Sequence, residues 1–460
     1  MKNFINTFIE ENQANIERDL LALVAIESVE AAAVSTCPFG ENVGKALELV
    51  TAIGNKLGLN AVNHNGYYVT IDLGEVSLPH QAVGVLSHAD VVPLGEGWHH
   101  NPLGEVTDSR IYGRGTLDDK GPTIATIYAM AAIKKSGVKL SKPVRLIVGG
   151  NEETGSLCIH RYNGENLPLW GGFSPDGDFP VIFAEKGIAI HKSTFTANSQ
   201  YIDSITAGTA VNAVPGKAVA VIKNLDYEQL NSLIKKNPRA EQISLEEPDE
   251  GKLKITVIGK STHGSTPERG ENAIATLLAV LSPLAESDEL ISKLSCLQQL
   301  FCTDHNGQAA GIAISDEVSG KLTINLGVLN YENNQLTWEL DLRYPVTKEY
   351  QPIKAVLDKA LAQQNITLTC VEHKPPLYVD KNSPLVKTLV NIYAESGRKD
   401  IEPLAIGGGT YCRAMENFVA FGPLGAGDED TMHQADEYIE KKHLQFLCQI
   451  YAKAIYSLAI

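Results

Sequence analysis

The feature of this sequence that most restricts its fold is the alternation of strand-like and helical patterns in the first third of the chain. Apolar runs at Val83–Ser87 and Val144–Gly149 predict buried strands, and helical periodicity covers Lys45–Lys56 and Ile124–Lys135. Strands that alternate with helices form a largely parallel sheet covered on both faces. Ligands bind such sheets at the carboxyl ends of the strands. We therefore expect a ligand site where polar residues follow these two strands.

In the middle of the chain the pattern changes. Apolar and polar residues alternate in several segments, which predicts antiparallel strands with one exposed face, and helical segments lie between them. This region is therefore predicted to be a separate α+β unit. Its predicted strands are Lys252–Ile258, Lys321–Val328 and Gln335–Arg343, its helices are Asn272–Ala285 and Ile353–Gln363, and a charged loop is expected at Lys235–Gly251.

Strand, glycine-rich loop and helix patterns resume after about Pro375 and end in a predicted helix at Tyr438–Leu458. We predict a first domain formed by residues 1–190 and 375–460, with a second domain, residues 191–374, inserted between its two parts. More than one domain agrees with the length, because 460 residues are too many for one ordinary core.

Composition narrows the class of protein further. The net charge of -16 argues against nucleic acid as a partner, because phosphate binding needs a basic surface. The sequence has 7 cysteines and no C-x-x-C motif. This cysteine usage fits a reducing compartment. Charged residues interrupt the apolar positions of Met1–Glu30, so this segment is predicted to be an amphipathic helix and not a signal peptide. No stretch is long enough to span a membrane, and we expect a cytoplasmic protein without a membrane partner.

Short polar motifs carry the chemistry. His88-Ala89-Asp90 follows the first predicted strand and Asn151-Glu152-Glu153 follows the second; Asp118-Asp119, Ser174-Pro175-Asp176 and Thr431-Met432-His433 complete the set. Imidazole with carboxylate is a ligand set suited to zinc, manganese or cobalt. Adjacent carboxylates repel each other unless cations lie between them. The motifs therefore predict a site for two metal ions.

Each motif also has an ordinary structural interpretation. His88 and Asp90 are typical of a surface loop, although at a strand end Asp90 could instead hold the second ring nitrogen of His88. The adjacent aspartates could start a helix, with one as its N-cap. The remaining alternatives are a solvent-facing Glu152-Glu153 pair, a core position for His433, and exposed loop positions for His99 and His100.

Over nearly its whole length the chain resembles the co-catalytic zinc metallopeptidase family that contains carboxypeptidase G, aminoacylases and carnosinases. The resemblance is closest to the PepV-type bacterial dipeptidases, through the Gly97-Trp98 step and the Gly407-Gly408-Gly409-Thr410 loop. Its most distinctive motifs are His88-Ala89-Asp90-Val91-Val92-Pro93, Gly113-Arg114-Gly115 followed by Asp118-Asp119-Lys120-Gly121-Pro122, Asn151-Glu152-Glu153-Thr154-Gly155, and Thr431-Met432-His433-Gln434-Ala435.

The resemblance implies an α/β fold: a mostly parallel-sheet catalytic domain for two zinc ions, with an inserted α+β (ferredoxin-like) lid domain. It also implies a role for each motif residue and a cis peptide bond between Asp118 and Asp119. Asp178 lies close enough to Asp176, and Asp119 to Asp118, to leave these two assignments open. The implied roles are metal ligation by His88, Asp118, Glu153, Asp176 and His433, orientation of His88 by Asp90, and general-base catalysis by Glu152.

Substrate-contacting residues are implied in the same way. His263 resembles the family's oxyanion-stabilising histidine, Asn212 resembles a substrate-contacting asparagine, and Arg343 resembles an arginine that reads the peptide carboxylate. Gly409 and Thr410 would supply close backbone approach and amide donors to the same carboxylate. The ordinary alternatives are a loop histidine at 263 and a strand-edge salt bridge at 343.

The function expected from the resemblance is hydrolysis of small, unblocked dipeptides with two divalent metal ions, zinc first and manganese or cobalt as alternatives. An N-acyl amino-acid deacylase would have the same catalytic centre, and an inactive binding protein could keep the same fold. A monomer is favoured over a homodimer, because the inserted region is larger than a single two-helix lid.

Overall fold

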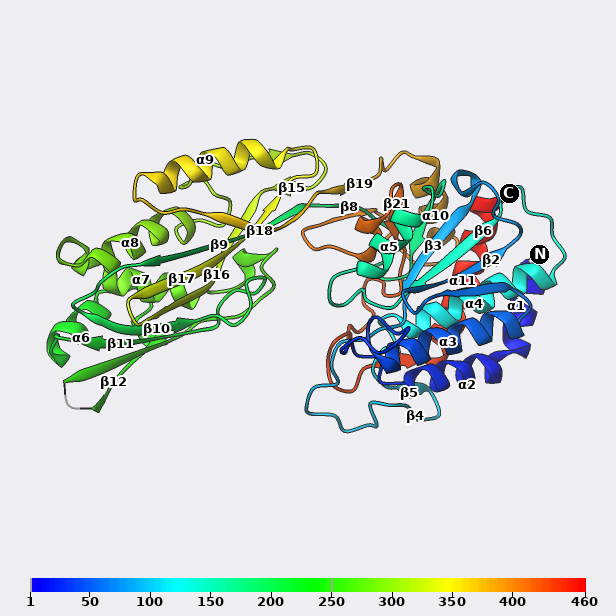
Figure 1. Cartoon of the computed structure of the whole chain (residues 1–460), viewed down its shortest axis with the longest axis horizontal. Helices are drawn as coiled ribbons and strands as arrows, with labels where there is room; N and C mark the ends of the chain where they lie inside the picture. Colours follow the sequence, from blue (N-terminus) through cyan, green and yellow to red (C-terminus); the bar gives the residue numbers. More distant parts are fainter. Residues whose placement is uncertain (1, 250) are drawn as a thin grey trace. The chain divides into compact units, whose positions relative to one another are not determined.

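A computed structural model of the chain describes residues 2–249 and 251–460. The structure divides into two compact units. Unit 1 consists of residues 1–184, 378–405 and 409–460, and unit 2 consists of residues 185–377 and 406–408. Each unit is built around its own sheet, and the two are treated separately below (Figure 1).

The sheet of unit 1 has its parallel strands at the centre. The strand order is β1-β2-β6-β3-β7-β21-β8-β19, with β20 on β8. The central strands β6, β3, β7 and β21 run parallel to one another. β1 and β2 pair antiparallel on the β6 side, and β8 pairs antiparallel with β21. The strands are β1 Asn60–His64, β2 Tyr68–Leu73, β3 Val83–His88, β6 Val144–Gly149, β7 Gly171–Ser174, β8 Ile182–Glu185, β19 Leu377–Tyr378, β20 Leu404–Ile406 and β21 Phe418–Ala420; a small separate sheet contains β4 Glu105–Val106, β5 Arg110–Tyr112 and β22 Tyr438–Glu440.

The expected mixed α/β fold with a largely parallel sheet is confirmed. The predicted strand at Val144–Gly149 has the bounds of β6, and the one at Val83–Ser87 is β3 without its last residue. His88 lies opposite Gly149 in the register. The carboxyl ends of β3, β6 and β7 therefore meet at one edge of the sheet, and the polar motifs start there.

Helices cover this sheet, and the helix α4 (Lys120–Lys135) is the most enclosed of them. Its residues from Lys120 to Ile133 are all buried, because the sheet lies on one side and other helices cover the rest. A helix that is apolar nearly all round is expected in such a position. The other helices of unit 1 are α1 Lys2–Glu11, α2 Gln13–Val24, α3 Glu41–Lys56, α5 Leu157–Glu165, α10 Pro384–Ala394 and α11 Lys441–Ala459.

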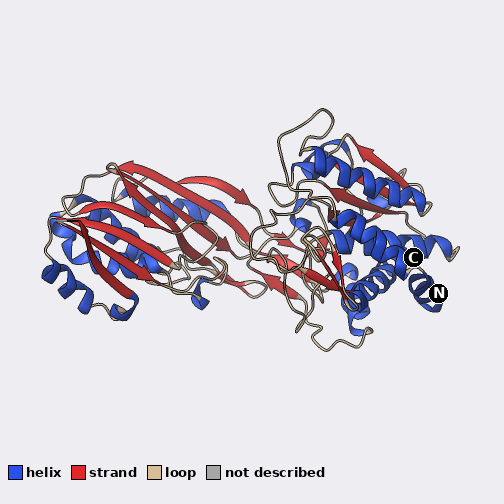
Figure 2. Ribbon diagram, turned by 90° about the horizontal axis from the view of Figure 1, so that it is seen from below, coloured by secondary structure: helices blue, strands red, loops and turns tan. Residues whose placement is uncertain are grey.

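Unit 2 is an α+β unit with a broad antiparallel sheet and helices against it (Figure 2). The strand order is β12-β13-β11-β10-β16-β17-β9-β18. Residues of the strands and of all the helices below share one hydrophobic core, in which Trp338 is fully buried. The strands are β9 Gly187–Thr196, β10 Ile202–Ala207, β11 Lys217–Lys223, β12 Ile243–Asp249, β13 Lys252–Ile258, β16 Thr323–Glu332, β17 Gln335–Tyr344 and β18 Thr369–Lys374, with a short pair β14 Ser315–Asp316 and β15 Gly320–Lys321; the helices are α6 Tyr227–Lys235, α7 Ala273–Leu281, α8 Glu289–Phe301 and α9 Tyr350–Ala362.

Three predicted elements were wrong. The N-terminal segment forms two helices, α1 and α2, in place of the single helix predicted, and Asn12, whose φ of -100° and ψ of 6° are not helical, lies between them. The charged stretch at Lys235–Gly251 contains strand β12, whose Ile243 and Leu245 pair with β13. The C-terminal helix begins only at Lys441, because the residues before it form β22 against β5.

The cysteines are free thiols. Among the residues that the structure describes, no helix has the length and apolar character needed to cross a bilayer.

Candidate metal centre

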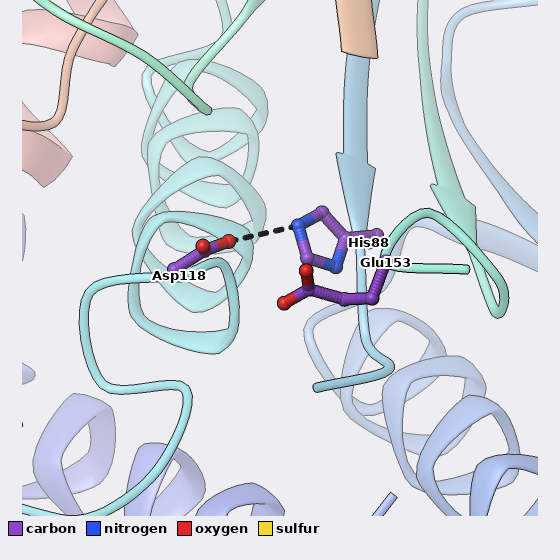
Figure 3. A group of neighbouring side chains, drawn as sticks. All are labelled: His88, Asp118 and Glu153. Atoms are coloured by element: carbon purple, nitrogen blue, oxygen red, sulfur yellow. Dashed lines mark hydrogen bonds and ion pairs between the residues drawn. The ribbon is translucent and has the colours of Figure 1, made fainter. Parts of the chain in front are cut away.

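The ends of β3, β6 and β7 bring histidine and carboxylate side chains of unit 1 together. Two groups have potential ligand atoms that all lie within 4.8 Å of one another: His88 with Asp118 and Glu153, and His88 with Glu152 and Asp176. Figure 3 shows the first group, with Asp118 at the start of α4 and the imidazole of His88 directed toward it from the end of β3.

Asp118 lies between the two histidines. Its Oδ1 is 3.0 Å from Nε2 of His88, and its Oδ2 is 2.8 Å from Nε2 of His433. Nε2 of His433 is also 3.3 Å from Oε1 of Glu153, and Nε2 of His88 is 3.9 Å from Oδ2 of Asp176. The five residues that the resemblance implies as ligands therefore form one cluster. One carboxylate oxygen of Asp118 faces His88 and the other faces His433.

The geometry separates Asp118 from Asp119. The peptide bond between them is cis, as expected. Asp119 is fully buried and accepts hydrogen bonds from the hydroxyl of Ser87 and the backbone N–H of His88. It occupies the N-cap position of α4 without making a side-chain cap. Asp178 belongs to neither group of potential ligands, whereas Asp176 does.

Asp90 has a second role that the sequence did not reveal. The Nδ1 atom of His88 lies 3.1 Å from the carbonyl oxygen of Asp90 and 3.5 Å from its Oδ1. The two carboxylate oxygens of Asp90 accept the backbone N–H groups of Glu152 and Glu153, at 3.0 and 3.1 Å. Asp90 therefore positions both glutamates as well as His88.

Glu30 is another residue that no motif identified. Its Oε2 accepts a hydrogen bond from Nδ2 of Asn151 at 3.0 Å and one from the hydroxyl of Thr154. These contacts hold both ends of the loop that carries Glu152 and Glu153. A lone glutamate 121 residues earlier in the chain gives no sequence signal for such a contact.

The electrostatics of the cluster favour bound cations. Burial raises the pKa of Asp176 to about 7 and holds the pKa of Glu152 well above its usual range, and neighbouring carboxylates add to both shifts. Hydrogen bonds to Asp118 and Glu153 raise the pKa of His433 to about 10. Oε1 of Glu153 is itself buried and lies against Nε2 of His433. Carboxylates gathered out of water need positive charge between them, so the residues present fit a metal ion.

His99 and His100, in the loop after β3, differ in their exposure to solvent. His99 is exposed, as predicted, and its Nδ1 lies 2.8 Å from Asp436. The exposed position predicted for His100 was wrong, because its ring stacks on Tyr112 with the centroids 3.7 Å apart and is only partly exposed.

The implied substrate-contacting residues of unit 2 lie close together although they are far apart in the sequence. Ala213 forms a β-bridge with His263, and the N–H of Gly264 donates to the carbonyl of Asn212 at 2.6 Å. A side chain at position 264 would meet the Asp341 carboxylate at 2.8 Å, so a glycine is needed there. Asn212 and His263 are exposed.

His263 is held in one tautomer. The backbone N–H of Ser265 donates to Nδ1 of His263 at 3.2 Å, and the hydroxyl of Ser265 lies 2.6 Å from the same atom. An accepting Nδ1 leaves the proton of the neutral ring on Nε2. Partial desolvation of the ring and the nearby Arg343 guanidinium lower the pKa of His263, so the neutral ring with an Nε2–H donor is favoured.

Arg343 forms a salt bridge, which was the structural alternative to substrate binding at this position. Its Nε and Nη2 donate to the two carboxylate oxygens of Asp341 at 2.7 and 2.8 Å. Its Nη1 donates to the carbonyl of Gly407 at 3.2 Å. Three of the five N–H groups of a guanidinium are thereby used, and two are left for other acceptors.

The loop of residues 407–410 is divided between the two units. Gly407 and Gly408 belong to unit 2, and Gly409 and Thr410 belong to unit 1. The hydroxyl of Thr410 accepts the N–H of Cys412 and starts a short 3₁₀ helix.

Comparison with known proteins adds to this geometry. The model described as "Peptidase family M20/M25/M40" matches residues 84–457. The Bacillus subtilis protein "Putative dipeptidase YtjP" is 37% identical over 454 residues, which cover 96% of each chain. A Staphylococcus aureus USA300 protein, also named "Putative dipeptidase", is 35% identical over 468 residues, which cover 98% of each chain.

Solved structures share the fold at low sequence identity. Human carnosine dipeptidase 1 matches with a TM-score of 0.59 and 13% identity, covering 100% of this chain and 98% of that one. A Staphylococcus aureus tripeptidase matches with a TM-score of 0.56 and 16% identity, covering 97% and 99%.

Proposed function

The chain belongs to peptidase family M20/M25/M40, and from this premise we propose that it is a metal-dependent dipeptidase that hydrolyses the peptide bond of unblocked dipeptides. The observation that carries the proposal is the position of Asp118 between His88 and His433. Two relatives that span nearly the whole chain and are named dipeptidases support the substrate class.

The donor set would hold two divalent ions, zinc by preference. In this proposal His88 and Asp176 would hold one ion, Glu153 and His433 would hold the other, and Asp118 would be shared by both. When bound, the ions polarise a carbonyl oxygen and lower the pKa of a coordinated water. The contacts among these five side chains support this division of the ligands.

Glu152 is proposed as the general base. It takes a proton from the attacking water and passes it to the nitrogen of the leaving amine. Its pKa is raised by burial, and a base with a raised pKa accepts a proton more readily. Asp90 holds the backbone N–H of Glu152, so the base is fixed next to the metal ligand Glu153. Because Glu152 lies close enough to His88 and Asp176 to share a metal ion with them, its roles as base and as ligand are distinguished by mutation.

Unit 2 is proposed to recognise the substrate and to stabilise charge. The Nε2–H of His263 would donate to the oxyanion, a task that a neutral imidazole can perform. Asn212 and the two remaining N–H groups of Arg343 would bind the peptide and its carboxylate, and Gly409 and Thr410 of unit 1 would bind the same carboxylate. We propose that one chain is sufficient for activity, so the enzyme acts as a monomer.

A comparison of substrates tests the proposed function. The purified protein is assayed with an unblocked dipeptide, the matching tripeptide and the matching N-acetyl amino acid. We expect the dipeptide to be hydrolysed much faster than the other two. Preference for the N-acetyl amino acid would instead indicate a deacylase, and a metal-loaded protein that hydrolyses none of the three would indicate a binding protein.

Metal content provides a separate prediction. Protein purified without chelator should contain about two zinc-type ions per chain, because the donor set offers two histidines and three carboxylates around two positions. Removing the ions with a chelator should abolish hydrolysis, and adding zinc should restore it. Elemental analysis before and after chelation measures this, and a metal-free protein that still hydrolyses dipeptides would contradict it.

A further inference from the structure

Glu437 is a buried carboxylate to which no sequence motif assigns a role. It lies four residues after His433 in the chain, immediately before β22, and is fully buried. Its Oε1 accepts the backbone N–H groups of Leu117, Gly115 and Asp118, at 2.9, 3.1 and 3.3 Å. Its Oε2 accepts Nη1 of Arg114 at 2.7 Å. Every one of these donors belongs to the segment that ends at Asp118.

Backbone and side-chain contacts reinforce this connection. The N–H of Gly113 donates to the carbonyl of Glu437 at 2.9 Å. Arg114 is buried, and its Nη2 donates to the carbonyl of Leu94 at 3.2 Å while its guanidinium lies 5.3 Å from the centre of the Trp98 ring. The loop of residues 431–436, here called the His433 loop, directly precedes Glu437. The segment from Gly113 to Asp118 is therefore attached to the residue that follows this loop.

The His433 loop needs such an anchor. His433 and Asp436 both have left-handed backbone conformations, with φ of 60° and 59°, which residues other than glycine rarely adopt. His433 is itself half exposed, so packing alone does not fix its ring. A buried attachment at Glu437 limits how far this loop can move away from Asp118.

We propose that Glu437 is a positioning residue of the metal centre: by attaching the Gly113–Asp118 segment to the His433 loop, it fixes Asp118 against His433 and strengthens metal binding. The inference rests on the proposed function, because it assumes that this cluster binds metal. Residues that orient metal ligands typically change metal affinity by about 10–100-fold when they are substituted.

A merely structural ion pair is the alternative, and unit 1 contains a matched control for it. Asp72 on β2 accepts Nε and Nη2 of Arg145 on β6 at 2.8 and 2.7 Å, and both side chains are largely buried. Asp72 and Arg145 are partners in the register near the start of β6, at the opposite end of that strand from Glu152 and Glu153. Breaking this pair should lower stability without moving a metal ligand.

The experiment compares Glu437→Gln with Asp72→Asn. An amide places an NH₂ group against the N–H donors or the guanidinium, so each substitution disrupts its own cluster with little change in volume. Zinc is titrated into the metal-stripped proteins by calorimetry, and thermal unfolding of the same samples is measured. We expect a lower unfolding temperature in both variants, but zinc binding that is weaker by about 10–100-fold only in Glu437→Gln.

Several outcomes would overturn the inference. The inference is wrong if Glu437→Gln binds zinc as tightly as the wild type. It is also wrong if zinc binding is weakened equally in Glu437→Gln and Asp72→Asn. Wild-type protein that binds no zinc would overturn the proposed function, and this inference with it. If Glu437→Gln does not fold, Arg114→Lys is measured instead, because it keeps the charge and the backbone contacts of Glu437 but loses the planar donor group. Weaker zinc binding in that variant supports the inference, and unchanged binding overturns it.

Discussion

Glu152→Gln is expected to lower kcat by about 10²–10⁴ while the protein keeps its metal ions, because the substitution removes a proton carrier and leaves the ligands in place. The amide has nearly the same volume as the carboxylate. The backbone N–H of Glu152 still donates to Asp90, so the loop should keep its shape. The measurement is steady-state kinetics on a dipeptide together with metal analysis of the same sample.

Glu153→Gln is the matched comparison, since it makes the same change at the next residue. Glu153 contacts His433 through its buried Oε1, which lies 3.3 Å from Nε2 of the imidazole ring. Its loss should therefore weaken metal binding, and excess zinc should restore part of the activity. Excess zinc should not restore Glu152→Gln. If the two variants lose metal equally, the proposed division between base and ligand is wrong.

The fold near the site could be predicted because its signals are local. β6 and β3 are short apolar runs with a polar motif immediately after each, and parallel pairing brings such motifs to one edge. β12 could not be predicted in this way. Its alternating Ile243 and Leu245 lie within a highly charged segment, and its strand conformation depends on pairing with β13.

The ligand cluster could be predicted from motifs, but the residues that support it could not. Asp118 and Asp119 are adjacent and chemically identical, and only the direction of each side chain distinguishes them. Glu30 accepts hydrogen bonds from distant side chains, and Glu437 accepts them mainly from distant backbone N–H groups. A contact between a glutamate and a distant backbone amide leaves no pattern of residue types, so its prediction requires the tertiary structure.

His263→Ala is expected to lower kcat by about 10²–10³, the range for losing one oxyanion donor, with metal content and KM close to those of the wild type. The reason is that the neutral ring of His263 is held in the tautomer that carries its proton on Nε2. Ser265 occupies Nδ1, so the proton of the neutral ring is on Nε2 and this atom is the donor. A donor that acts on charge formed during the reaction contributes to kcat more than to substrate binding.

Ser265→Ala is the control for this prediction. It removes the hydroxyl, but the backbone N–H of residue 265 still donates to Nδ1 and keeps the same tautomer. Turnover near the wild-type level is therefore expected for Ser265→Ala, in contrast to His263→Ala. Measuring kcat, KM and bound metal for both variants separates loss of the donor from disturbance of the loop.

The outcome for His263→Ala also decides what unit 2 contributes to the reaction. The proposed metal ligands and Glu152 belong to unit 1, whereas His263 belongs to unit 2. A fall in kcat with unchanged metal content would mean that unit 2 supplies a group that acts on the reacting carbonyl. Near-normal turnover would remove His263 from the chemistry, and unit 2 would then have a role only in recognising the substrate.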